Sequence, residues 1–137
     1  MGQQQLLLII LGVIVVGIAV AVGITMFQDN AVSANRDAVT NDLVNLAARA
    51  QQHYRRPIAL GGGQGSFDGS TGGSAIATIN DLTSKPANAN GSYVVGTVAA
   101  TNIVITGTGT ETGDDGSTPV EVEMTVFADS TAVVFNN

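Results

Sequence analysis

The sequence predicts an α+β fold, in which one long N-terminal helix over about residues 3–56 carries a small C-terminal antiparallel sheet of about four strands on its second half. Two features support this prediction. No Asp, Glu, Lys or Arg precedes Asp29, and no proline interrupts the chain before Pro57, as expected of a single long helix. After about residue 91 apolar residues instead alternate with polar ones, which is typical of strands that are buried on one face.

The first half of the predicted helix is an apolar run from Leu6 to Phe27. About 22 helical residues at 1.5 Å each are about 33 Å long, close to the hydrocarbon thickness of a bilayer. With its continuation to Arg56 the helix is roughly 80 Å long, several times the length that is usual in globular proteins. A chain of 13.9 kDa cannot cover such a helix, so lipid or further copies of the same chain must do so.

The second half of the helix is amphipathic. Its apolar residues recur at steps of three and four and predict one buried face, made up of Val32, Val39, Leu43, Leu46, Ala47, Ala50 and Tyr54. The other positions predict a face in a polar setting, with Asn35, Arg36, Asp37, Asn41, Asp42, Asn45, Arg49 and Gln52. Arg55, Arg56 and Pro57 end the helix, because cations favour the negative end of the helix dipole and proline cannot continue the hydrogen-bond pattern.

These patterns divide the chain into three regions. Residues 1–56 form the helix, with an apolar membrane or filament-core segment at 1–28 and an amphipathic stem at 29–56. Residues 57–91 form a glycine-rich loop region, and residues 92–137 form the antiparallel sheet. Within the loop region we expect Phe67 to pin the glycine-rich stretch 61–73, whereas residues 75–82 fit either a short helix or a strand.

The sheet is predicted to be an antiparallel meander with strands at residues 92–98, 102–106, 119–128 and 131–136. The stretch from Gly107 to Thr118 is rich in glycine and threonine and is predicted to be a loop. In the third strand two sets of side chains alternate. The apolar set is Val120, Val122, Met124 and Val126, and the second set is Glu121, Glu123, Thr125 and Phe127. We expect the apolar set to lie on the helix and the second set to face solvent.

The composition predicts neither an enzyme nor a nucleic-acid-binding protein. The net charge is −6 and the pI is about 4.3, so the surface repels phosphate groups and no specific nucleic-acid partner is expected. The chain has no cysteine, which excludes disulfides and thiolate metal sites. His53, the single histidine, is expected to be a partly exposed residue at the helix end. No arrangement of Ser, His and acid is recognisable, so we expect no catalytic residue, no cofactor and no metal.

The acidic turn at Asp114, Asp115 and Gly116, with Glu111 nearby, has the composition of a calcium-binding loop. Its spacing does not match the EF-hand pattern, and acidic turns rich in glycine are common on protein surfaces. The sequence therefore favours a simple surface turn.

An uncharged N-terminal helix that is apolar first and amphipathic second, followed by a loop and a small antiparallel sheet, resembles a bacterial type IV pilin or a closely similar pseudopilin. The specific signal lies in residues 1 to about 54. The resemblance implies that a prepilin peptidase cuts the precursor before Met1, which is then the mature and often N-methylated terminus; a second register starts the mature chain at Gln3. Gln5 stands where the family usually carries a glutamate that pairs with the terminal amine of a neighbouring subunit, and the cysteine pair common in the family is absent.

The resemblance implies a structural function. The chain is expected to reside in the inner membrane as a precursor and to polymerise, with a pilus assembly machinery, into a helical extracellular filament of identical subunits that serves surface attachment, motility or a similar purpose. Its expected assembly core comprises Met1, Gln5, Leu6, Leu7, Leu8, Ile9, Ile10, Leu11, Gly12, Val13, Ile14, Val16, Gly17, Ile18, Val20, Val22, Ile24 and Phe27.

Three alternatives share the long apolar helix. A pseudopilin of a secretion system would form short filaments, a membrane-anchored binding module would need only the apolar half of the helix, and filamentous-virus coat proteins usually lack a separate β head. The uninterrupted passage from the apolar run into the amphipathic stem favours the filament subunit, because an anchor does not require that continuity.

Overall fold

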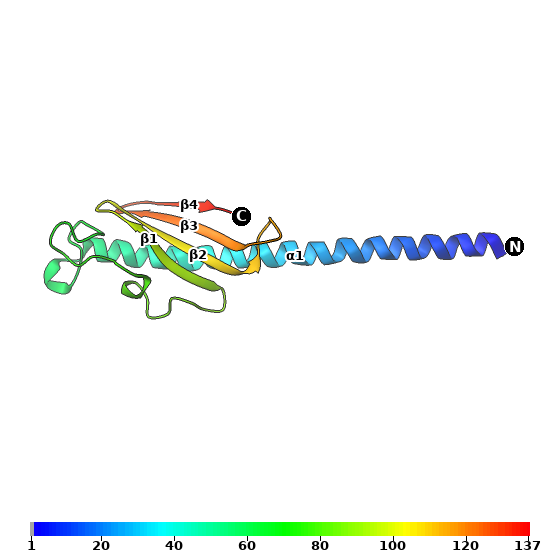
Figure 1. The fold of residues 1–137 in the computed structure, drawn as a ribbon, viewed down its shortest axis with the longest axis horizontal. Coiled ribbons are helices and arrows are strands. Elements are labelled where there is room, and N and C mark those ends of the chain that lie inside the picture. Colours follow the sequence, from blue (N-terminus) through cyan, green and yellow to red (C-terminus); the bar gives the residue numbers. More distant parts are fainter. Residues whose placement is uncertain (1) are drawn as a thin grey trace.

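The computed structural model describes residues 2–137 and has the predicted α+β fold (Figure 1). A single helix, α1 (Gly2–Arg55), runs along the whole molecule, and two short 3₁₀ helices follow it, η1 (Ile58–Leu60) and η2 (Ile79–Asp81). Four strands complete the chain: β1 (Gly91–Val98), β2 (Asn102–Thr112), β3 (Pro119–Phe127) and β4 (Thr131–Phe135). The first half of α1 projects bare from the head that the loops and the sheet form around its second half.

The head is held together by one face of α1 and one face of the sheet. The strands form an antiparallel meander in the order β1-β2-β3-β4, and α1 packs against β2 and β3. The alternation predicted for the third strand is confirmed, since every second side chain of β3 from Val120 to Val126 is fully buried. The apolar face of the stem is also confirmed, because Val39, Leu43, Leu46, Ala47 and Ala50 are buried, and Val32 and Tyr54 pack against this core.

The predicted end of the second strand at Thr106 is wrong, because β2 continues to Thr112 and takes up half of the predicted loop. Two glycines in this extension explain the error. A Cβ atom on Gly107 would lie 2.7 Å from Val39 Cγ1, and one on Gly109 would overlap the Asn35 side chain. Glycine is therefore needed here so that the sheet can approach the helix closely, and it does not mark a turn.

The loop region 57–91 is irregular but has a core of its own. Phe67 is fully buried, and its ring centroid lies 4.7 Å from that of Tyr54, which confirms that Phe67 pins the glycine-rich stretch. Of the two possibilities for residues 75–82, the structure has the helical one, limited to the single turn η2. The Asp81 carboxylate caps this turn by accepting hydrogen bonds from the backbone N–H groups of Ala77 (2.9 Å) and Thr78 (2.8 Å).

Candidate assembly surface

The bare half of α1 presents apolar side chains to every side. All the large apolar residues predicted for the assembly core are more than half exposed, namely Leu6, Leu7, Leu8, Ile9, Ile10, Leu11, Val13, Ile14, Val16, Ile18, Val20, Val22, Ile24 and Phe27. Gln5 is exposed as well, and a Cβ atom on Gly12 or Gly17 would meet no other atom within 4 Å. Met1, the expected mature terminus, lies outside the described residues.

This apolar segment cannot remain in water. Monomeric soluble proteins rarely expose a contiguous apolar patch of more than a few hundred Å², and this one surrounds the helix over about 20 residues. By length and composition α1 is able to cross a membrane, and its most apolar stretch has no part buried within the subunit. The segment is therefore a surface for lipid or for protein.

Polar side chains of the stem lock the head onto the helix. Asp42 receives hydrogen bonds from Tyr93 Oη (2.5 Å), Asn88 Nδ2 (2.8 Å) and Asn90 Nδ2 (2.9 Å). Burial by itself raises the pKa of Asp42, but the hydrogen bonds, with that of Tyr93 the strongest, outweigh it and hold the pKa below its ordinary 3.8. Burial, and then the neighbouring Asp42 carboxylate, raise the pKa of the Tyr93 phenol. Asp42 thus ties α1 to β1 and to the loop before it.

A second group of polar contacts lies at the end of the head from which the bare half of α1 projects. Asn35 donates to the Asn90 carbonyl (2.9 Å) and accepts from the Thr110 backbone N–H (3.1 Å). Arg36 donates to Asp114 (2.9 Å) and to the Asn137 carbonyl (2.7 Å). The polar face that the sequence predicts is thus partly an attachment surface for the sheet. Sequence reasoning missed these partners, because a polar residue on a helix looks the same whether it contacts water or a neighbouring strand.

The lowered pKa of Asp42 predicts a loss of stability in acid. A carboxyl group whose pKa is lower in the folded than in the unfolded chain stabilises the fold above the unfolded value and loses this contribution as the pH falls through the folded value. We expect Asp42→Asn to lower the thermal midpoint of the detergent-solubilised chain at pH 6, and the difference from wild type to shrink below about pH 4. Asp37→Asn is the matched control, since Asp37 is exposed and its side chain makes no hydrogen bond within residues 2–137. An equal difference at pH 6 and pH 2.5 would contradict this role of Asp42.

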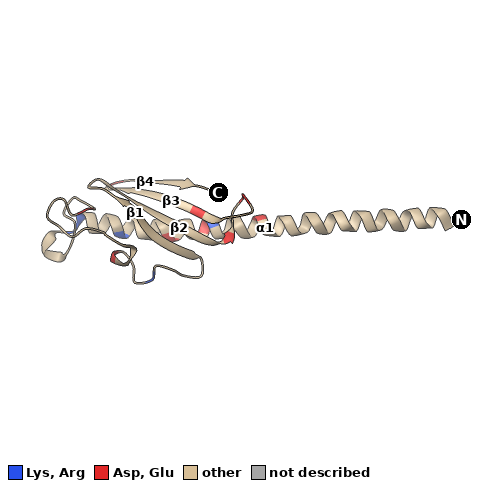
Figure 2. Ribbon diagram, in the orientation of Figure 1, with Lys and Arg blue, Asp and Glu red and all other residues tan. Residues whose placement is uncertain are grey.

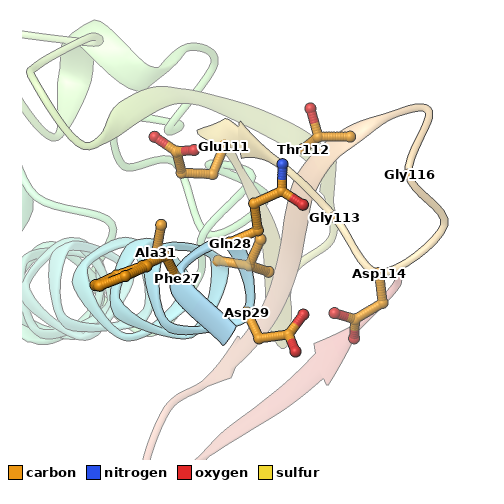
Figure 3. A pocket seen from close by; sticks show the side chains of 10 residues that line it. Phe27, Gln28, Asp29, Ala31, Glu111, Thr112, Gly113, Asp114 and Gly116 are labelled. Carbon is orange, nitrogen blue, oxygen red and sulfur yellow. The ribbon is translucent and has the colours of Figure 1, made fainter. Parts of the chain in front are cut away.

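A cavity of about 780 Å³ lies where the bare helix enters the head (Figure 3). One wall is α1 and the other is the end of β2 with the turn after it, and the lining residues are Phe27, Gln28, Asp29, Ala31, Val32, Glu111, Thr112, Gly113, Asp114 and Gly116. The carboxylates of Asp29 and Asp114 point toward each other across the opening. This junction cavity therefore combines an apolar floor with an acidic rim.

The acidic turn beside the junction cavity is stabilised from within. The Asp115 carboxylate accepts hydrogen bonds from the backbone N–H groups of Ser117 and Thr118, both at 2.9 Å, and from the Thr118 hydroxyl. These bonds, that of the Thr118 hydroxyl first, hold the pKa of Asp115 below its ordinary value. Within the described part of the chain, no group of three His, Asp or Glu side chains is placed to hold a metal ion.

His53 is the remaining group with possible chemical function. Its side chain is half-buried, its Nδ1 atom is enclosed without a hydrogen-bond partner among the described residues, and burial, followed by the charge of Arg56, lowers its pKa. The nearby Ser66 hydroxyl donates instead to Asp68 (2.5 Å).

Comparison with protein-family models, curated proteins and solved structures finds no match to this chain.

Proposed function

We propose that this chain is the structural subunit of a pilus-like extracellular filament that assembles through the bare half of α1. The observation that carries the proposal is the division of one continuous helix between two environments. Residues 39–50 of α1 bury five side chains under the sheet, whereas the large apolar side chains from Leu6 to Phe27 are all exposed. The sheet therefore covers one half of the helix, and the apolar side chains of the other half need a partner outside the subunit.

Identical copies are the partner that meets this need outside a membrane. Burying several hundred Å² of apolar surface per neighbour at about 25 cal/mol per Å² contributes many kcal/mol before the entropy of association is subtracted. The head sits on only one end of the rod. Copies that associate with their helices parallel and shifted along the axis therefore do not form a closed dimer. Such a contact repeats, and the product is a helical filament with the heads outside and the apolar helices inside.

The same helix explains how the subunit is held in a membrane before assembly. A segment of membrane-spanning length and composition holds the precursor in a bilayer, with the head on one side of it. Extraction from lipid is then balanced by burial against other copies. The resemblance to type IV pilins points to the inner membrane, a prepilin peptidase and a pilus assembly machinery as the setting, and to a structural protein without enzymatic activity.

Negative-stain imaging of the sheared cell-surface fraction tests the proposal. We expect uniform filaments that contain this chain and are long and abundant. Only monomers, or chain that stays in the membrane fraction under all conditions, would contradict it and favour a membrane-anchored binding module. Short filaments of low abundance would favour the pseudopilin of a secretion system.

A further inference from the structure

Charge is distributed unevenly along the rod (Figure 2). Asp29, Glu111 and Asp114 line the junction cavity, whereas Arg55 ends α1 and Arg56 follows it at the opposite end of the stem. Within residues 2–137 the single salt bridge joins Arg36 to Asp114, so Asp29 and Glu111 at one end and both arginines at the other have no charged partner in their own subunit. The two ends are electrostatically complementary but cannot meet within one chain.

The same two ends also match in their apolar side chains. Ile58 and Leu60 of η1, directly beyond the arginines, are 42% and 70% exposed. At the junction cavity Phe27 is 77% exposed beside Ala31 and Val32. Each end therefore has an uncovered apolar centre beside charges that have no ion-pair partner among the described residues, acidic at the cavity and basic at the tip.

We infer that the helix tip of one copy, formed by Arg55, Arg56, Ile58 and Leu60, docks into the junction cavity of a second copy. This inference rests on the proposed filament and specifies a contact between its heads. The apolar tip residues fill the floor at Phe27, and the arginines pair with Asp29 and Glu111. The occupant is a second copy because the chain itself supplies both the cavity and its complement.

The dimensions of the rod agree with this contact. Asp29 and Arg55 are about 26 helical residues apart, so a tip that reaches the next junction cavity shifts neighbouring copies by about 40 Å along the helix. The bare segment, residues 2–28, is also about 40 Å long. The shift therefore lays the bare segment of one copy beside the stem of the next, whose exposed face includes Val44 and Ala48 among polar residues. The displacement that joins the charged ends thus also brings the bare segment against a second copy.

Disulfide trapping tests the contact directly, because the chain contains no cysteine. The double variant Leu60→Cys with Glu111→Cys is assembled into filaments, oxidised and run on a non-reducing gel. We expect a ladder of covalent oligomers, since each copy would link to one copy above it and one below. The matched control pairs Leu60→Cys with Asn136→Cys, because Asn136 is also exposed but does not line the cavity; this pair should give no ladder.

Intact filaments without a ladder from the Leu60 and Glu111 pair, or equal ladders from both pairs, would overturn the contact. If the cysteine-free parent forms no filaments at all, the proposed function fails, and the contact fails with it. Charge exchange gives a second readout that needs no cysteine. Arg56→Glu and Glu111→Arg should each shorten the filaments several-fold, and the double variant should restore their length; a double variant no longer than either single one would also overturn the contact.

Discussion

Filament assembly is expected to disappear when Val16 is replaced by aspartate. Val16 lies in the middle of the bare segment and is 61% exposed. In the filament that we propose, neighbouring copies enclose its side chain. A carboxylate in that position has no partner, and an unpaired buried charge is among the most destabilising groups in a protein. Because every copy carries the substitution, the cost repeats at every subunit.

Membrane insertion should survive the same change. A single aspartate at the centre of a membrane helix costs about 2.5–3.5 kcal/mol, which the remaining apolar residues of the segment offset. The experiment therefore measures the amount of each variant in two fractions. Val16→Asp should remain in the membrane fraction and be missing from the sheared filament fraction, whereas Val16→Leu should be found in both. Normal filaments from Val16→Asp would contradict the proposed filament core.

Replacing Leu43 with alanine is expected to destabilise the head by about 2–5 kcal/mol, the usual range for a buried leucine. Leu43 is fully buried between the stem and the sheet, while its neighbour Val44 is 52% exposed on the same turn of α1. Val44→Ala is therefore a matched control that should change the free energy of unfolding by less than about 0.5 kcal/mol.

Urea unfolding of the detergent-solubilised chain, followed by tyrosine fluorescence, measures both changes. The chain has no tryptophan, and Tyr93 is buried in the head, so the signal reports on the head. Equal losses from the two variants would show that the stem does not pack against the sheet as described.

The sequence was sufficient for the elements whose pattern is set by local chemistry. The N-terminal run without charged residues or proline predicts a helix. The alternation from Val120 to Val126 predicts both a strand and its buried face. It was insufficient where the role of a residue depends on a distant segment. Gly107 and Gly109 look like turn residues until Val39 and Asn35 are seen to lie against them.

The candidate site likewise has features that the sequence reveals and features that only the fold reveals. The apolar residues of the bare segment are visible in the sequence, because they form one continuous run that the rest of the chain is too small to cover. The role of Asp42 and the junction cavity are not visible, because each is made by residues from two elements that the fold brings together. Asp29 and Glu111 line the same cavity although more than half of the chain separates them.

The meander has a consequence for the order in which the head folds. Each strand pairs with its neighbour in the sequence, and the turns between the strands are short, so the contacts within the sheet are local and are expected to form early. The contacts between stem and sheet join residues far apart in the chain, such as Asn35 and Thr110, which are separated by 75 positions. Closing these distant contacts between stem and sheet is therefore expected to be the slow step in folding of the head, and it involves none of the residues of the bare segment.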